Sequence, residues 1–123
     1  MKGISFLLVG SGGAIGSMLR YAAASFIPAK SFPWPTLLVN IAGSFIIGMI
    51  AGWGIRSTEF SSGNLRLFLA TGVCGGFTTF SSFSAENLKL LQEGRYMISL
   101  LYIGFSFISG IAAAWAGYKM FTL

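Results

Sequence analysis

A short polar and aromatic stretch, GGFTTFSSF from Gly75 to Phe83, interrupts a segment that is otherwise apolar. Phe80 and Phe83 are three residues apart, so on a helix their rings share one face. An aromatic ring is negative on its face and positive at its edge, so ring edges along a polar path can favour a small anion without a full positive charge. Phenylalanine in such a segment is also commonly lipid-facing or a filler of the core, and these two rings alone do not decide between the interpretations.

The helix that would follow this stretch is polar almost all round. Its polar side chains are Thr79, Ser81, Ser82, Ser84, Glu86 and Asn87. A transmembrane helix with this pattern cannot face lipid broadly, so the pattern favours a polar path or a protein interior. Glu86 precedes Lys89 by three residues, so it can pair with that lysine or lie where an ion leaves the path.

Two other segments carry polar residues at helical spacing. Thr36 and Asn40 are four residues apart, and Tyr102 and Ser106 repeat that spacing later in the chain. An asparagine amide deep in a membrane needs a hydrogen-bond partner, so Asn40 either bridges helices or lines a pore. Because these groups are mainly donors and hydroxyls, with few acids among them, the pattern suits an anion better than a cation.

A helix break is expected at the start of the polar stretch. Gly75 and Gly76 weaken a helix by about 1 kcal/mol each relative to alanine, and the β-branched Thr78 and Thr79 follow them. Such a break near the middle of a membrane is tolerated only where the released carbonyls are satisfied, so carbonyls near Gly75 and Thr78 need a hydroxyl, a water or a bound cation. An intact helix that uses the glycine pair for tight packing is the alternative.

The elements that must position these residues follow from the composition. Of the 123 residues, 54% are hydrophobic and 9% are charged, which is typical of a membrane protein. A transmembrane helix needs about 20 apolar residues, so the chain, residues 1–123, has room for about four spans in a single domain. The apolar runs are Ile4–Ile27, Trp34–Ile55, Arg66–Leu91 and Met97–Tyr118. They are long and lack an alternation of period two, so we predict an all-α membrane protein with four transmembrane helices.

Several functional classes are excluded by missing residues. The chain has one cysteine, Cys74, and no histidine, so neither an intrachain disulfide nor a zinc site is expected. An enzyme would need a base near its nucleophile, and the chain has no histidine and no clustered pair of acids, so we expect no catalytic residues. A small multidrug or cation transporter is the alternative, but a multidrug exporter needs a carboxylate in its first span, which this chain lacks. The basic residues are scattered singly, which does not indicate a nucleic-acid partner.

The basic residues are divided equally between the two ends of the predicted helices. Lys2, Arg56, Arg66 and Lys119 lie at the end that carries both termini. Arg20, Lys30, Lys89 and Arg95 lie at the other end, where Arg20 can snorkel to the lipid headgroups. Because an excess of Lys and Arg normally marks the cytoplasmic side, this balance gives insertion no preferred direction. Either the balance is chance, or the chain inserts both ways and forms an antiparallel dimer with a two-fold axis in the membrane plane.

A dimer would also explain how an ion could pass. Four helices packed around a filled core leave no ion pathway, so a conduit needs more than one subunit. Glycines four residues apart would let helix backbones approach closely, although this spacing is common in membrane helices. The pairs are Gly12 with Gly16, Gly48 with Gly52, and Gly72 with Gly76.

Three stretches resemble the signatures of the Fluc fluoride channels, also called CrcB proteins. They are GSGGAIGSMLRY in the first span, PTLLVNIAGSFIIG in the second and GVCGGFTTFSSFS in the third, and they occur in the right order over most of the chain. Members of that family are dual-topology homodimers of four-helix subunits with two narrow fluoride pores, and they let cytoplasmic fluoride leave passively. The resemblance therefore implies a fluoride-selective channel in the plasma membrane of a prokaryotic cell, assembled as an antiparallel homodimer.

The resemblance also implies roles for individual residues. Phe80 and Phe83 would be the pore phenylalanines whose ring edges contact fluoride, and Asn40 would be the pore asparagine. The further pore residues would be Thr36, Ser81, Ser84, Glu86, Tyr102, Ser106 and, near the wide entrance, Arg20. Backbone carbonyls of Gly75 and Thr78 from both subunits would hold a central Na⁺ at the dimer interface.

Overall fold

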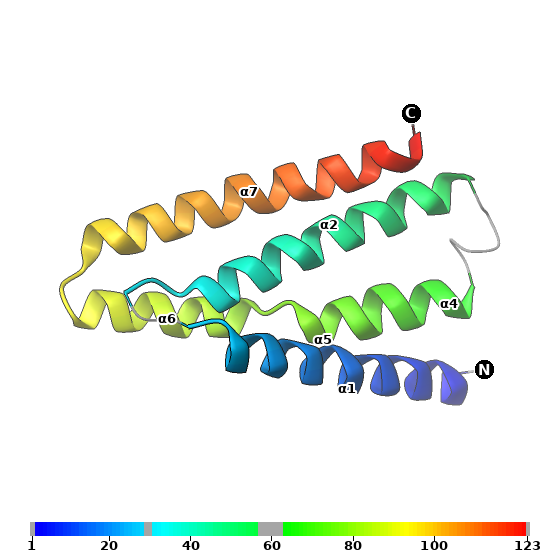
Figure 1. The fold of residues 1–123 in the computed structure, drawn as a ribbon. Helices are drawn as coiled ribbons and strands as arrows, with labels where there is room; N and C mark the ends of the chain where they lie inside the picture. The colour runs from blue at the N-terminus through cyan, green and yellow to red at the C-terminus, as the bar shows by residue number, and fades with distance from the viewer. Residues whose placement is uncertain (1, 29–30, 57–62, 123) are drawn as a thin grey trace.

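The computed structural model describes residues 2–28, 31–56 and 63–122, which contain helices and no strands (Figure 1). The helices are α1 (Lys2–Phe26), α2 (Trp34–Arg56), α4 (Asn64–Arg66), the π-helix η1 (Leu67–Cys74), α5 (Gly75–Phe77), α6 (Phe80–Gln92) and α7 (Tyr96–Thr122). Four helical segments of this part of the chain are long and apolar enough to cross a membrane: Lys2–Phe26, Trp34–Ile55, Asn64–Gln92 and Tyr96–Thr122. The prediction of four transmembrane helices is confirmed in length and composition, and the chain is a multi-pass membrane protein.

The ends of the long helices follow from local sequence. α1 ends at Phe26, two residues before Pro28, which disfavours helical geometry in the residue that precedes it. α2 begins at Trp34 with Pro35 in its first turn, where a missing N–H costs no helical hydrogen bond. α6 is closed by Gly94 at φ 75°, with the Gly94 N–H on the Leu91 carbonyl and the Arg95 N–H on the Leu90 carbonyl, a Schellman motif.

Glycines bring two pairs of helices into backbone contact. A Cβ on Gly12 of α1 would lie 2.6 Å from the Phe68 carbonyl oxygen of η1, and one on Gly52 of α2 would lie 2.6 Å from the Tyr118 carbonyl oxygen of α7. The other four members of the predicted glycine pairs also lie close to backbone atoms of a neighbouring helix, most closely at Gly16, Gly48 and Gly76 and less closely at Gly72. The predicted close approach is therefore confirmed, and it takes place within one chain.

The third membrane segment changes its helical type twice. Eight residues, Leu67–Cys74, form the π-helix η1, and Gly75 and Gly76 continue as part of α5. The chain is extended at Thr78 (φ −82°, ψ 157°) and Thr79 (φ −151°, ψ 123°) before α6 begins. The interruption thus follows the glycine pair instead of coinciding with it, and its predicted depth near the middle of a membrane stays a prediction.

α1 begins and α7 ends at the same end of the molecule (Figure 1), and many large apolar side chains are exposed. Its buried hydrophobic side chains in the described ranges are few: Leu37, Val39, Ile50, Cys74, Leu90 and Tyr102. Large apolar side chains are exposed on every long helix, including Phe6 of α1, Ile47 of α2 and Ile108 of α7. A surface of this kind is suited to lipid or to another apolar protein surface.

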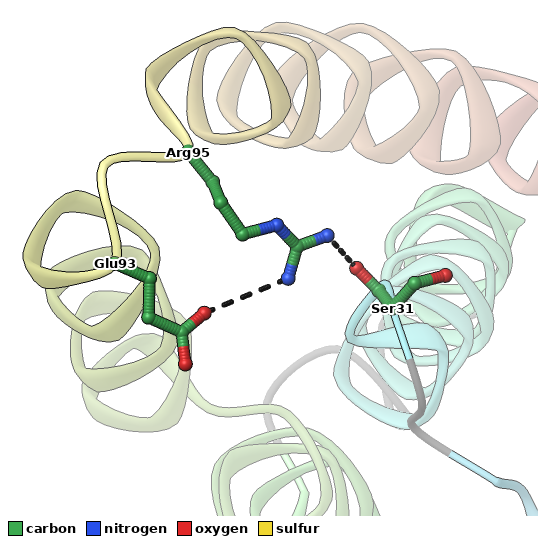
Figure 2. Close-up of polar contacts among 3 residues, drawn as sticks. All are labelled: Ser31, Glu93 and Arg95. Carbon is green, nitrogen blue, oxygen red and sulfur yellow. Dashed lines mark hydrogen bonds and ion pairs between the residues drawn. The ribbon is translucent and has the colours of Figure 1, made fainter.

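A polar contact links two connections at the end opposite the termini. Arg95, the residue before α7, donates from Nη2 to the Ser31 carbonyl and forms an ion pair with Glu93 at 3.6 Å (Figure 2). Lys30, which the charge count places at this end, lies outside the described residues, as does the side chain of Arg56 at the other end.

Candidate functional site

Asn40 of α2 is bonded to the interrupted backbone of the third segment. Its Nδ2 donates to the Thr79 carbonyl at 3.1 Å, and its Oδ1 accepts from the Thr79 N–H at 2.9 Å. The extended conformation removes the Thr79 N–H from the helical hydrogen-bond ladder, and the asparagine amide bonds both this N–H and the Thr79 carbonyl. Asn40 therefore bridges helices. It also lines the cavity described below, and its place in a pore stays a prediction.

Gly75 and Thr78 are among the residues whose carbonyls lack their usual helical donors at the interruption. The N–H that would close on the Gly75 carbonyl is that of Thr79, and it donates to Asn40. The N–H that would close on the Thr78 carbonyl is that of Ser82, and it donates at 3.1 Å to Oγ1 of Thr79, the N-cap of α6. Gly75 and Thr78 are the two residues predicted to present carbonyls to a cation, and their carbonyls are chemically suited to that role.

A cavity of about 420 Å³ opens beside the interruption. It lies between α2, the third segment and α7, and its lining includes Asn40, Gly75, Thr78, Phe80, Phe83 and Ser106. Ser106 Oγ is buried and has no hydrogen-bond partner among the described residues. The cavity reaches the surface of the chain, because the Phe80 side chain at its edge is 73% exposed. Its walls are mostly apolar, with amide and hydroxyl donors at separated points, as in many sites for small ligands.

A second cluster surrounds the carboxylate of Glu86. Thr36 Oγ1 of α2 donates to Glu86 Oε2 at 2.7 Å, and Tyr102 OH of α7 donates to Glu86 Oε1 at 2.9 Å. Thr36 and Tyr102 are both buried. Within the described residues Glu86 forms no ion pair with Lys89, the partner that the helical spacing suggested. Two helices, α2 and α7, thus direct hydroxyl groups at one carboxylate of α6.

Phe83 connects the cavity to the carboxylate cluster. Its ring centroid lies 5.8 Å from that of Phe80 at the cavity edge and 4.9 Å from that of Tyr102 in the cluster. Phe107 of α7 meets the Phe83 ring edge to face at 6.2 Å, and Phe32 meets Tyr102 in the same way at 5.2 Å. The predicted shared face of Phe80 and Phe83 is confirmed, and it belongs to a continuous aromatic row.

Three predicted site residues lie outside this assembly. Ser81 and Ser84 are exposed on α6 and line neither the cavity nor the carboxylate cluster, and Ser81 Oγ lies 3.4 Å from Thr79 Oγ1. Arg20 of α1 donates from Nε to the Gly76 carbonyl at 3.1 Å, so the guanidinium is bonded to the third segment. Ser81, Ser84 and Arg20 can reach an ion path only where the surface of the chain forms part of it.

Sequence reasoning missed two contacts of this region. Ser99 of α7 donates to Asn87 Oδ1 at 2.7 Å inside the bundle, and Phe32, before α2, packs on Tyr102. Ser99 precedes Tyr102 by three residues, a helical spacing that could have pointed to it. Phe32 lies outside every helix and carries no comparable periodic signal.

A metal ion at this site would be bound by backbone carbonyl and hydroxyl oxygens and not by a cluster of carboxylates. Residues 2–28, 31–56 and 63–122 contain no group of three His, Cys, Asp or Glu side chains that could hold one. The carbonyls of Gly75 and Thr78 and the nearby hydroxyls are hard oxygen donors, which suit an alkali or alkaline-earth cation more than a transition metal.

Comparison with known proteins gives a consistent result. Residues 7–118 match the model of the CrcB-like protein family, which is described as camphor resistance (CrcB). A protein of Hyphomonas neptunium named fluoride-specific ion channel FluC is 47% identical, with 94% of this chain and 93% of the relative covered. Proteins of the same name from Thermus thermophilus (47% identical, 94% and 91% covered) and Agrobacterium fabrum (46% identical, 93% and 93% covered) are similarly close.

Proposed function

The chain belongs to the CrcB-like family, and we propose that it is a fluoride-selective ion channel through which cytoplasmic fluoride leaves the cell passively. The observation that carries this proposal is the buried, unpartnered hydroxyl of Ser106 in a cavity that also presents Asn40 and the rings of Phe80 and Phe83. A dehydrated fluoride ion needs hydrogen-bond donors, and the hydroxyl and the positive ring edges supply them without a fixed positive charge that would trap the anion.

The path we propose runs from the cavity along Phe83 to the carboxylate cluster. Phe80 and Phe83 offer ring edges, Ser106 offers its hydroxyl, and Asn40 holds the interrupted backbone beside the ion. At the far end Thr36 and Tyr102 both donate to Glu86. An arriving fluoride can accept from one of these two hydroxyls while the other remains on the carboxylate, so that both anions keep a hydrogen-bond donor.

One subunit gives an incomplete path. The cavity is open at the surface, Phe80 is mostly exposed, and Ser81 and Ser84 project from the same helix. An antiparallel homodimer with dual topology would cover this surface, and the equal division of basic residues supports insertion in both directions. In such a dimer Ser81 and Ser84 would line the polar track formed with the second subunit. Arg20, bonded to the Gly76 carbonyl, would lie near the wide entrance.

The same dimer would provide a site for Na⁺. The carbonyls of Gly75 and Thr78 have lost their helical donors, and the same two carbonyls from a second subunit would complete a set of oxygen ligands. A bound cation would supply a fixed positive charge between the subunits and would hold the two interrupted segments together.

Anion efflux from liposomes tests the proposed function. Purified protein is reconstituted into vesicles loaded with fluoride or chloride, and release is followed with ion-selective electrodes after a potassium ionophore sets the membrane potential. We expect rapid release of fluoride and release of chloride close to that of protein-free vesicles. Equal release of the two anions would remove the selectivity, and no release of fluoride would refute the channel.

Cysteine labelling in intact cells tests the orientation. Gln92, exposed at the end of α6, is replaced by cysteine, and the unmodified chain with its buried Cys74 serves as the background. Dual topology predicts that an impermeant maleimide labels about half of the molecules from outside and the remainder only after permeabilisation. Labelling of all molecules from one side would contradict insertion in both directions.

A further inference from the structure

Two buried polar side chains lie outside the proposed ion path. The buried polar side chains of the described ranges are Thr36, Asn87 and Ser99, which are 8%, 8% and 2% exposed. Thr36 belongs to the carboxylate cluster, whereas Asn87 of α6 and Ser99 of α7 hydrogen-bond each other. Burying polar groups is unfavourable unless they are hydrogen-bonded, and a pair of small apolar residues would fill the same space without that requirement. The pair therefore has a purpose that packing alone does not explain.

The pair connects α7 to the turn of α6 that carries Phe83. Ser99 Oγ donates to Asn87 Oδ1 at 2.7 Å, and Asn87 Nδ2 donates to the Phe83 carbonyl at 2.9 Å. Asn87 is four residues after Phe83, so its side chain points back along the helix toward that turn. A continuous chain of hydrogen bonds runs from Ser99 to the backbone of Phe83.

A ring contact runs beside this hydrogen-bonded chain. Tyr102 follows Ser99 by three residues and shares its face of α7, and the Tyr102 ring lies 4.9 Å from that of Phe83. The Tyr102 hydroxyl reaches Glu86, the residue before Asn87, at 2.9 Å. Any rotation of α6 against α7 that breaks the bond between Ser99 and Asn87 would therefore also displace the Phe83 ring from Tyr102.

We infer that Asn87 and Ser99 are positioning residues that hold the Phe83 ring in the wall of the cavity and against Tyr102. Apolar contact between α6 and α7 is non-directional and leaves α6 free to rotate about its own axis. Hydrogen bonds fix both distance and angle, so the pair of Asn87 and Ser99 fixes this rotation. The described lining of the cavity includes neither residue, so they act through Phe83 and not on the ion. The effect of these residues on fluoride conduction rests on the proposed function, whereas their effect on the position of the Phe83 ring does not.

Fluorine NMR tests the position of the ring without any measurement of transport. Phe83 is replaced by 4-fluorophenylalanine in purified protein, and a second sample carries the label at Phe121, whose ring stacks on Trp53 at 6.2 Å in another part of the bundle. We expect Ser99→Ala to shift or broaden the signal at position 83 and to leave the signal at position 121 unchanged. Ser109→Ala is the matched control, because it removes a hydroxyl of α7 that, within the described part of the chain, bonds only the Phe105 carbonyl of its own helix, at 2.5 Å. A signal at position 83 that Ser99→Ala does not move would overturn the inference.

Fluoride efflux tests the consequence for conduction. Ser99→Ala is expected to lower the flux per folded molecule about tenfold, the change that corresponds to one buried hydrogen bond, while Ser109→Ala has no effect. In a Phe83→Ile background, Ser99→Ala should cause little further loss, because the ring that Ser99 positions is absent. Losses that multiply independently in the double variant would overturn the positioning role.

The two tests separate this inference from the proposed function. A displaced Phe83 signal in a protein that conducts no fluoride would support the positioning pair and refute only the channel. Fluoride conduction by the unmodified protein, with flux and Phe83 signal both unaffected by Ser99→Ala, would leave the channel intact and refute the pair.

Discussion

The two ends of the α2–α7 pair are constructed differently. Near the termini, Gly48 and Gly52 of α2 lie directly against the backbone of α7 at Ala114 and Tyr118, with no side chain between them. Near the α6–α7 turn, Thr36 of α2 and Tyr102 of α7 meet at a carboxylate contributed by α6. In the view of Figure 1 the two helices diverge toward this second end.

The difference shows how a small bundle combines rigidity with a polar interior. Backbone contact at the glycine end excludes both side chains and water, so it fixes the two helices without any polar group. At the other end a third helix enters, and its carboxylate is satisfied by two hydroxyl donors that surround it. A glycine contact tolerates no added atom, whereas the polar end tolerates changes that keep a hydrogen bond. Four substitutions test this contrast.

The largest effect is expected at the glycine end. Gly48→Ala places a Cβ against the Ala114 carbonyl oxygen, a contact with backbone that cannot be relieved by a side-chain rotation. We expect a loss of about 3 kcal/mol in the free energy of unfolding, measured as the folded fraction across a titration of denaturing detergent. Gly104→Ala of α7 is the matched control, because a Cβ there meets no atom within 4 Å. Equal stability of the two variants would remove the contrast between the ends.

The next effect is expected at the carboxylate. Glu86→Gln keeps the shape of the side chain, but the amide nitrogen cannot accept a hydrogen bond, so either Thr36 or Tyr102 loses its acceptor. We expect a loss of about 2 kcal/mol in the same titration. Lys89→Gln is the control, since Lys89 does not pair with Glu86, and an effect as large as that of Glu86→Gln would contradict the described cluster.

A smaller effect, on conduction alone, is expected at the cavity edge. Phe80→Ile keeps much of the bulk and removes the ring edge, and the side chain is 73% exposed, so folding of the subunit should change little. The fluoride flux should fall about tenfold, which is equivalent to the energy of one favourable ring interaction. Met18→Ile, at a residue of α1 that is 64% exposed, is the control for general effects of an apolar exchange. Unchanged flux in Phe80→Ile would assign the ring to packing.

The smallest effect is expected beyond the polar end, where Arg95 joins the connection before α2 to the α6–α7 turn. Arg95→Ala removes both the bond to the Ser31 carbonyl and the ion pair with Glu93 (Figure 2). Because the Arg95 side chain is partly exposed and its charge is screened by water, we expect a loss of about 1 kcal/mol or less in the free energy of unfolding. The loss should be smaller still at high salt. Glu93→Ala, which removes only the ion pair, should cost less, and the reverse order would mean that the ion pair dominates.

The sequence was sufficient to predict the membrane-spanning helices and several features that depend on local helical geometry. Apolar length alone located the four spans within a few residues, because burial in lipid depends on length and composition more than on contacts. The spacing of Phe80 and Phe83 gave their shared face, because helical geometry is local. The three glycine pairs were also recognised, although their partners were not, since a small residue shows where a backbone can approach and not which one does.

Contacts between residues far apart in the sequence could not be predicted from apolar length or residue spacing. The position of the interruption is one example: the glycines remain helical, and the chain departs from the helix where Asn40 supplies two hydrogen bonds to Thr79, 39 residues away. Glu86 is another, because its spacing from Lys89 suggested a local pair, while Thr36 and Tyr102 compete successfully from two other helices. For Ser99 the sequence offers only its helical spacing from Tyr102, while its bond to Asn87 comes from another helix.

The π-helix η1 has a consequence for how this channel family can vary in length. A π turn closes five residues back instead of four, so Leu67–Cys74 contains more chain than an α-helix of the same number of turns. The N–H of Gly75 bonds the carbonyls of both Ala70 and Gly72, so wide and narrow turns already share a donor where η1 ends. Deletion of one residue within η1 can therefore be absorbed by a return to α geometry, while α5 and Thr78 keep their places. Insertions and deletions in this span should accordingly collect in η1, and the residues after it should keep a constant spacing.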